Sequence, residues 1–388
     1  MRPYPHEKAI VRHMDLPPHR RILALSDIHG SLEFLKGALE AARFTSDDIL
    51  FVVGDILEKG KQSLETLRYL MELSKTHTVY PLRGNCDQIT LDFMAQPQQG
   101  WDDEMVWRVM HTGWWKDTGF FWQLANRAGV PLNGPGDLPT LREAIVRHYA
   151  AELNFLRATP TVIETQNHIF VHGGIPREDR LEELENIPLL KNDDFLGQGL
   201  SFKKWVVVGH WPVTLYRADI AQADPIVERT RHIISIDGGC VLKADGQLNV
   251  LIIPDRDSED FSWVSYDGFP TATALDDQEA SENPLNIRWS ERWVEVLERG
   301  EEFTLCRHLA TGRELRILTD YLRQEPEGTA CEDSTDYTLP VRAGDTLRVV
   351  RRVTGGALVK KDGVTGWYWG RLLGPPPRGS APGPRPLF

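Results

Sequence analysis

The sequence Ser26-Asp27-Ile28-His29-Gly30 places a carboxylate and an imidazole two residues apart, directly after the apolar run 22–25. A helical pattern follows, so the pair lies at the carboxyl end of a strand, where open α/β sheets bind ligands. Asp and His are both common metal ligands. Alone the pair is weak evidence, because an N-capping Asp followed by a surface His has the same spacing.

Four further apolar runs end in residues of the same kind. Neighbouring glycines allow sharp turns that direct each polar side chain into a crevice beyond the sheet. Chance supplies one such motif far more readily than five in order. The further motifs are Gly54-Asp55, Gly84-Asn85-Cys86-Asp87, His172-Gly173-Gly174 and Gly209-His210.

Together the strand ends supply a mixed set of oxygen and nitrogen donors, which suits Mn²⁺, Fe or Zn²⁺. Six ligands are too many for one metal with an open position. They fit two divalent ions about 3.5–4 Å apart that share a carboxylate, as in hydrolytic two-metal sites. Asp55 is central in the series and is the expected bridge. The six candidate ligands are Asp27, His29, Asp55, Asn85, His172 and His210.

The first third of the chain alternates strand and helix patterns, which predicts parallel strands joined by right-handed crossovers. Residues 93–160 interrupt this alternation, are rich in Trp, Arg and His, and include a helical pattern over 142–156. We expect a helical cap inserted in a catalytic domain spanning 1–257. The predicted strands are 21–26, 49–53, 78–82, 161–165, 169–171, 205–208, 232–236 and a hairpin over 239–253.

The rest of the chain changes character. Residues 258–285 are polar and acidic, which is typical of a linker. Two short β-patterned stretches follow, at 286–325 and 336–373. The Pro- and Gly-rich tail 374–388 is expected to be disordered.

Over residues 20–254 these motifs resemble the calcineurin-like metallophosphoesterases, most closely the phosphoprotein phosphatase branch and its bacterial relatives. The resemblance implies an α/β fold, with a double β-sandwich flanked by helices and metals at the shared sheet edge. It assigns Asp27, His29 and Asp55 to the first metal. It assigns Asp55, Asn85, His172 and His210 to the second, with Mn²⁺ the first choice for both.

Three departures from the family pattern carry information. Pro212 replaces a second His, which favours the phosphatase type of metal shell. Lys59, in Glu58-Lys59-Gly60, replaces an Arg and binds a phosphoryl oxygen as a point charge rather than a fork. Cys86 replaces the His that protonates the leaving group, and a Cys is a poor general acid. For Cys86 itself, packing as a small buried residue is favoured over a catalytic role.

Other residues near the motifs have two interpretations each. Arg83 is expected to bind phosphoryl oxygens with Lys59 and Asn85, or else to pair with Asp87 or a backbone carbonyl. Asp87 is expected to orient a ligand His without binding metal. Without His at position 86, leaving groups that need no proton are favoured, unless a cap histidine, His111 or His148, supplies the acid.

The function that follows is a two-metal phosphatase acting on phosphomonoesters, namely phosphoproteins, phosphotyrosine or small phosphates. A dinucleoside polyphosphate hydrolase or a nucleotide phosphodiesterase is the alternative enzyme. A scaffold or binding protein with a degenerate phosphatase core is the alternative of another class. The complete ligand set argues against the scaffold.

The stretch 336–373, with Gly366-Trp367-Tyr368-Trp369-Gly370, resembles bacterial Src-homology-3-like barrels, and 286–325 resembles a divergent copy. The resemblance implies a peptide or protein partner. Packing on the catalytic domain, or a dimer contact, is the alternative role.

The 388 residues carry a net charge of −12, which argues against a nucleic-acid duplex or an anionic membrane as partner. No apolar run approaches the length of a membrane span. The four cysteines form no pair motif, so we expect reduced thiols and a cytoplasmic protein.

Overall fold

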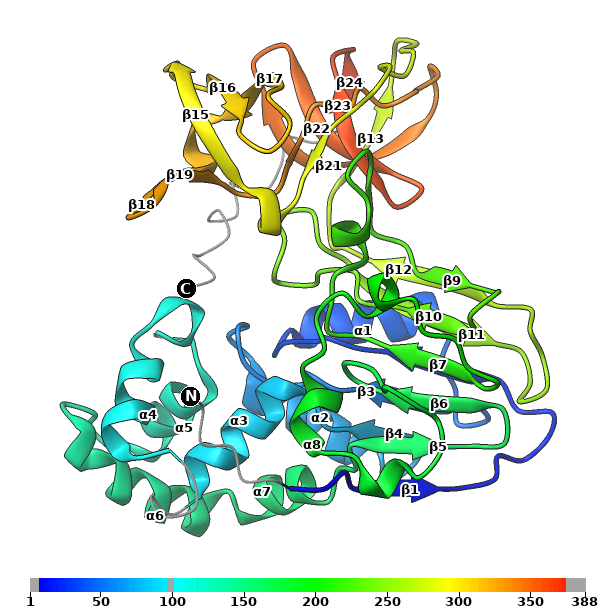
Figure 1. The fold of residues 1–388 in the computed structure, drawn as a ribbon, viewed down its shortest axis with the longest axis vertical. Coiled ribbons are helices and arrows are strands. Elements are labelled where there is room, and N and C mark those ends of the chain that lie inside the picture. Colours follow the sequence, from blue (N-terminus) through cyan, green and yellow to red (C-terminus); the bar gives the residue numbers. More distant parts are fainter. Residues whose placement is uncertain (1–6, 96–100, 117, 375–388) are drawn as a thin grey trace.

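The computed structural model describes residues 7–95, 101–116 and 118–374, and the tail expected to be disordered lies almost wholly outside them. Two sheets and their flanking helices form the lower part of Figure 1, the cap helices lie to one side, and the C-terminal sheets lie above. None of the helices within the described residues is both long enough and apolar enough to cross a membrane.

The first sheet has the strand order β12-β11-β2-β3-β4. The predicted parallel pairing of its first three strands in sequence is confirmed, with Ile22 opposite Ile49 and Ile49 opposite Thr78. The polar residues that follow these three strands therefore meet at one edge. The strands are β2 (Ile22–Leu25), β3 (Ile49–Val53), β4 (Thr78–Leu82), β11 (Leu248–Ile253) and β12 (Ser262–Tyr266).

The second sheet has the strand order β1-β5-β6-β7-β10-β9, and β6, β7 and β10 run parallel in it. The carboxyl ends of β6 and β7 deliver His172 and His210. The strands are β1 (Val11–His13), β5 (Val162–Glu164), β6 (His168–Val171), β7 (Trp205–Val208), β9 (Ile226–Glu228) and β10 (Ile233–Ser235).

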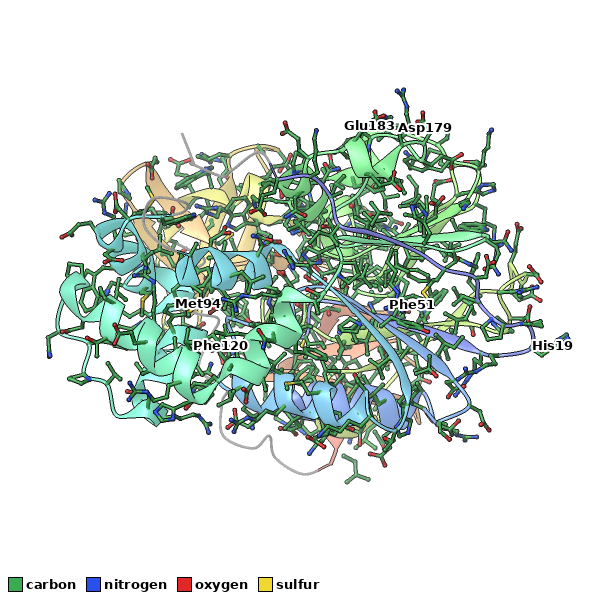
Figure 2. The ribbon with its side chains drawn as sticks, turned by 90° about the horizontal axis from the view of Figure 1, so that it is seen from below. His19, Phe51, Met94, Phe120, Asp179 and Glu183 are labelled. Carbon is green, nitrogen blue, oxygen red and sulfur yellow. The ribbon has the colours of Figure 1, made fainter. Side chains whose placement is uncertain are left out.

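A layer of apolar side chains joins the two sheets into a sandwich. Phe51 of β3 stacks on Phe170 of β6, with ring centroids 3.8 Å apart and planes 6° apart. Both rings are fully buried, and they belong to a cluster separate from the one that holds Phe120 of the cap (Figure 2). This stack fixes the spacing between strands that carry site residues from opposite sheets.

Helices cover the first sheet and build the cap. In α1 the buried residues Leu35, Ala38 and Leu39 recur at helical spacing and pack on the sheet. The single helix expected over 142–156 is instead two helices, because the helical conformation is interrupted at Tyr149. The helices are α1 (Leu32–Ala41), α2 (Ser63–Leu73), α3 (Asn85–Met94), α4 (Asp103–Met110), α5 (Phe120–Ala128), α6 (Leu138–His148), α7 (Ala150–Arg157) and α8 (Asn186–Leu190).

The linker predicted for 258–285 is wrong. These residues contain β12, which pairs with β11, and β13 (Thr271–Ala274), which pairs with β21 and β24 of the C-terminal region. The stretch looked irregular because β12 is an edge strand, and an edge strand needs only one apolar face. The hairpin expected over 239–253 is also reduced to the single strand β11 after a series of turns.

The C-terminal region contains two larger sheets, of strand order β17-β16-β15-β19-β18 and β24-β13-β21-β22-β23-β8. The first extends to Cys331, past the predicted boundary at 325. An Src-homology-3-like barrel here stays a prediction. The strands are β15 (Trp293–Glu298), β16 (Phe303–His308), β17 (Glu314–Leu318), β18 (Leu322–Glu325), β19 (Gly328–Cys331), β21 (Thr346–Val353), β22 (Gly356–Lys361), β23 (Val364–Tyr368) and β24 (Leu372–Leu373).

The C-terminal region is bound to the sandwich by backbone and side chains. The short strand β8 (Ala221–Gln222) pairs with Val364 and Thr365 of β23. Asn286, in the two-residue strand β14 (Asn286–Ile287) that pairs with β20 (Ser334–Thr335), donates to the carbonyls of Thr214 and Arg217 at 3.0 and 2.8 Å.

Replacing Phe170 by Ala removes the stack at the centre of the sandwich. We expect the free energy of unfolding to fall by about 3–5 kcal/mol, because ring burial is lost and a cavity is left. Urea unfolding followed by circular dichroism measures the loss. The control Val146→Ala, on the exposed face of α6, should change the unfolding free energy by less than about 0.5 kcal/mol. Similar losses in both variants would contradict this assignment of the core.

Candidate metal centre

The six predicted metal ligands lie at the shared edge of the two sheets, but the ring of His210 belongs to neither compact donor group and its Nε2 lies beside Asp193. Asp55 lies at their centre: its Oδ2 is 3.7 Å from Nε2 of His29, and its Oδ1 is 3.3 Å from Nε2 of His172. The Nε2 atom of His172 also lies 3.1 Å from Oδ1 of Asn85, and its ring centroid is 5.2 Å from that of His210. Five loops, each following a strand, thus converge on one carboxylate.

The backbone at these positions is strained. Asp27, His29, Asp55 and His210 have φ angles of 57°, 48°, 50° and 67°, in the left-handed region that side chains with a Cβ rarely adopt. Each such residue costs about 1–2 kcal/mol. Backbone hydrogen bonds hold the turns, including those from Asp27 N to Gly54 O at 3.1 Å and from His29 N to Asp55 O at 3.0 Å. Strain of this kind clusters at functional sites.

Two glycines are required for close approach. A Cβ at Gly84 would overlap both the backbone and the carboxylate of Asp55, and one at Gly209 would overlap the carboxylate of Asp27. The glycines were expected to allow sharp turns, and Gly54 does have a φ of 82°. At Gly84 and Gly209 the stronger constraint is the space occupied by a neighbouring carboxylate.

The donor atoms form two groups that share Asp55. One group is Asp27, Asp55 and His172, and the other is His29, Asp55 and Cys86, with the donor atoms of each group within 4.8 Å of one another. The Oδ1 atom of Asp27 is buried without a hydrogen-bond partner and lies 3.7 Å from Nε2 of His29. These carboxylates and imidazoles fit two cations bridged by Asp55.

Burial and neighbouring charges set the protonation of the site. Burial would raise the pKa of Asp55, but the charges of His172, His29 and Lys59 hold it well below its usual value. Burial would lower the pKa of His172, but Asp55 and Asp27 raise it to about 10. Burial and then the charge of Lys59 lower the pKa of His29 to about 3, so its imidazole is neutral and able to bind a metal.

The expectation that Asp87 orients a ligand histidine is wrong. Its carboxylate accepts hydrogen bonds from the backbone N–H groups of Ile56, Leu57 and Gly84, at 3.1, 3.1 and 2.9 Å. Asp87 therefore ties the loop after β3 to the start of α3, and it positions the backbone on both sides of Asp55.

Arg83 pairs with backbone carbonyls, which was the alternative to phosphoryl binding. None of its hydrogen bonds goes to the candidate metal ligands. The guanidinium donates to Oε1 of Gln88 at 2.9 Å and to the carbonyls of Arg157 and Thr159 at 3.0 and 3.1 Å. These carbonyls end α7, where a cation is favoured by the helix dipole. Arg83 thus anchors the cap helix to the loop after β4.

Lys59 lies beside the donor cluster, and its predicted contact with a phosphoryl oxygen stays a prediction. Its Nζ atom is 2.9 Å from Nε2 of His29 and 5.2 Å from the ring centroid of Trp114. Lys59, Asn85, Cys86 and His210 line a cavity of about 470 Å³. The other walls come from the cap (Trp101, Trp114, Trp115), the loop after β7 (Trp211) and the C-terminal region (Trp289, Asp333).

Neither cap histidine is among the described residues that line this cavity. His111 is exposed and its Nδ1 donates to the carbonyl of Trp107 at 2.7 Å, and His148 is exposed on α6. The sequence missed Asp193, whose Oδ1 lies 2.8 Å from Nε2 of His210, because no motif surrounds it.

Glu58 is a buried carboxyl whose neighbours were also not expected. Its oxygens accept hydrogen bonds from the Thr90 hydroxyl at 3.0 Å and from the Phe120 backbone N–H at 2.9 Å. Burial raises its pKa to about 8, against the lowering effect of these two bonds. Glu58 therefore joins the site loop to α3 and to the cap as a neutral acid.

The contribution of Glu58 to the stability of the metal-free protein should fall as pH rises from about 4.5 to about 8, because the folded chain keeps a proton on Glu58 that the unfolded chain has lost. Glu58→Gln carries no such proton. Its unfolding free energy relative to the natural chain should therefore rise by up to about 1.4 kcal/mol per pH unit in that window. Urea unfolding with a chelator at several pH values measures this difference, and a difference independent of pH would contradict the buried neutral carboxyl.

Comparison with known proteins agrees with this geometry. The family model described as calcineurin-like phosphoesterase matches residues 20–237. A Salmonella typhimurium serine/threonine-protein phosphatase 2 is 31% identical over 113 residues, covering 28% of this chain and 47% of that protein. A Pseudomonas syringae symmetrical bis(5'-nucleosyl)-tetraphosphatase is 45% identical over 56 residues, covering 14% and 19%. The chain thus spans less than half the length of these curated relatives.

Among solved structures, a cold-active protein-tyrosine phosphatase of a Shewanella species has 16% identity and a TM-score of 0.38, covering 64% of this chain and 80% of that one. A Saccharomyces cerevisiae protein serine/threonine phosphatase has 10% identity and a TM-score of 0.39, covering 68% and 84%. The family model covers more than half of the 388 residues and includes all six candidate ligands. The chain belongs to the calcineurin-like phosphoesterase family.

Proposed function

We propose that the protein is a metal-dependent phosphatase that hydrolyses phosphomonoesters at two divalent cations. The observation that carries this proposal is the pair of donor groups that share Asp55. The unpartnered Oδ1 of Asp27 adds support, because a buried carboxylate oxygen without a donor is costly unless a cation faces it.

The candidate ligands mix carboxylate, amide and imidazole, which suits Mn²⁺, Fe or Zn²⁺. Cations bound there supply Lewis acidity toward phosphoryl oxygens and activate water. Asp55 would hold both cations, while Asn85 and His210 face the cavity from which substrate enters. Lys59 would neutralise charge that develops on a phosphoryl oxygen.

Substrates differ in whether their leaving group must be protonated as it departs. Burial and the nearby Asp55 carboxylate raise the pKa of the Cys86 thiol well above its usual value, which makes it a weak acid catalyst. The cavity beside it carries indole rings and no cap histidine within the described residues. We therefore propose a preference for aryl phosphates such as phosphotyrosine, whose leaving groups need little protonation.

Hydrolysis of dinucleoside polyphosphates is the second candidate. Its support is the local identity to the Pseudomonas syringae tetraphosphatase, together with the cavity that the C-terminal region partly closes. A partly enclosed cavity of this volume, lined by indole rings, suits a small molecule with a ring system. The leaving group of a dinucleoside polyphosphate is itself a phosphate, which also needs little protonation. Binding of a peptide partner by the C-terminal sheets stays a prediction.

Asp55→Asn should remove the shared ligand. We expect bound metal to fall below two ions per chain and hydrolysis of p-nitrophenyl phosphate to drop by at least about 100-fold, since even indirect partners of a metal site cost up to that much. Elemental analysis and an assay in added Mn²⁺ measure both. A chelator should abolish activity in the natural chain. If the natural chain itself bound less than one metal ion and did not hydrolyse the substrate in added Mn²⁺, a scaffold with a degenerate core would be favoured instead.

Phosphotyrosine and phosphoserine peptides of matched sequence separate the substrate classes. A missing general acid costs about 10²–10⁴-fold, so kcat/KM should favour phosphotyrosine by at least about 100-fold. Diadenosine tetraphosphate is assayed in parallel, and a higher kcat/KM for it would favour the second candidate. Equal turnover of the two peptides would contradict the proposed role of the residue at position 86.

A further inference from the structure

Cys86 has surroundings unlike those of the other cysteines. All four lie within the described residues and are buried, but Cys240, Cys306 and Cys331 belong to apolar clusters and Cys86 does not. Its Sγ atom accepts from Nδ2 of Asn85 at 3.5 Å. A cysteine that only filled space would be packed against apolar side chains.

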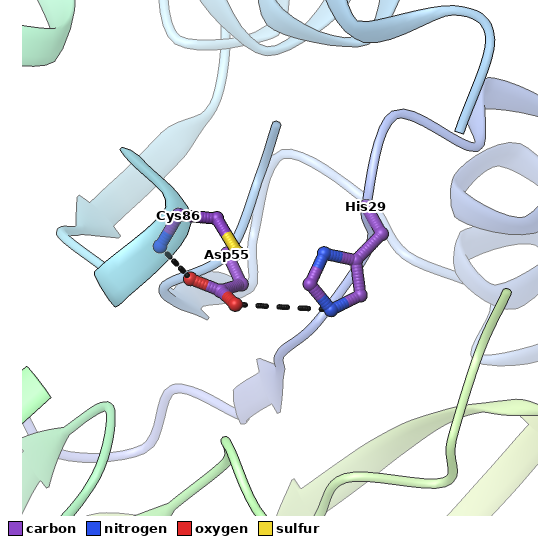
Figure 3. Close-up of side chains that lie close together, drawn as sticks. All are labelled: His29, Asp55 and Cys86. Atoms are coloured by element: carbon purple, nitrogen blue, oxygen red, sulfur yellow. Dashed lines mark hydrogen bonds and ion pairs between the residues drawn. The ribbon is translucent and has the colours of Figure 1, made fainter. Parts of the chain in front are cut away.

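The polar neighbours of Cys86 form a donor group. Figure 3 shows Cys86, at the start of α3, close to Asp55 and His29, which lie in the loops after β3 and β2. The backbone N–H of Cys86 donates to Oδ1 of Asp55 at 2.8 Å, which leaves Oδ2 directed toward Nε2 of His29 at 3.7 Å. With the Cys86 sulfur, these donor atoms lie within 4.8 Å of one another.

A second observation indicates that this position takes positive charge. The Lys59 ammonium lies 2.9 Å from Nε2 of His29, the nitrogen of the donor group. The side chain of Lys59 is long, and its ammonium also lies over the ring of Trp114 on the cavity wall. A divalent cation bound by this donor group would take the place of the ammonium.

We propose that Cys86 is a metal ligand, which binds through sulfur the cation that His29 and Asp55 hold. This inference rests on the proposed two-metal centre. Coordination forms a bond from the thiolate sulfur to the cation, and the thiol proton leaves to solvent. A sulfur donor selects Zn²⁺, Fe²⁺ or Co²⁺ over Mg²⁺ and Mn²⁺ at this position. The site would then hold two chemically different cations, because the group of Asp27, Asp55 and His172 contains no sulfur.

Cobalt substitution tests the sulfur bond without an activity assay. The chelated full-length chain is loaded with Co²⁺ and its absorption spectrum is recorded, alongside Cys86→Ser and Cys240→Ser. Cys240 is the matched control, since it is buried near the same loop, 3.9 Å from the Ile28 carbonyl, and lies in neither donor group. We expect a sulfur-to-cobalt charge-transfer band in the near ultraviolet for the natural chain and Cys240→Ser, and none for Cys86→Ser.

The outcomes separate the two proposals. Two bound Co²⁺ ions with no charge-transfer band, or a band that persists in Cys86→Ser, would overturn the role of Cys86 and leave the metal centre standing. Failure of the natural chain to bind Co²⁺ would overturn both. Far-ultraviolet circular dichroism checks that each variant is folded.

Metal competition gives a second, independent measure. Cys86→Asp keeps an anionic donor at this position but replaces sulfur by oxygen. We expect the ratio of Zn²⁺ to Mn²⁺ affinity to fall by at least about tenfold in this variant, since even residues that only support a ligand alter affinity by that factor. Titration calorimetry measures both affinities. An unchanged ratio would overturn the proposal.

Discussion

The structure depends on how it balances negative charge buried around Asp55. Several carboxyl groups lie together in a region of low dielectric, where unpaired charges repel strongly. Each is stabilised differently: Glu58 keeps its proton, Asp87 accepts three backbone N–H groups, and Oδ1 of Asp55 lies 3.3 Å from Nε2 of His172. The Oδ1 atom of Asp27 accepts no hydrogen bond, so it is one buried carboxylate oxygen here that no protein donor stabilises.

The same region is also where the backbone is least relaxed. Asp27, His29, Asp55 and His210 share left-handed conformations that each cost about 1–2 kcal/mol. The stacked rings of Phe51 and Phe170 and the continuous apolar layer around them supply the rigidity that holds such turns. The site is therefore strained locally and supported by a core that lies between the two sheets.

The sequence was sufficient to predict most of the sandwich strands from apolar periodicity, but not β1, β9 or β12. The polar residues at the strand ends predicted a shared metal site, and the family resemblance implied that the two sheets meet at one edge. The sequence could not predict where long side chains go. Arg83 bonds to carbonyls 73 to 76 residues later in the chain, and nothing local marks those partners. Within 258–285, the strand β12 was missed because an edge strand resembles a loop in composition.

The strand β8 lies inside the span of the family model, yet it forms the edge of a sheet whose other strands all lie beyond that span. The match to the family model also ends before β11, which lies between β12 and β2 in the first sheet. The region shared with the family is therefore not a separable module, and gene fusion or recombination at its boundary would expose two sheet edges. The two parts of the chain are consequently expected to be inherited together, and to have diverged as a single unit.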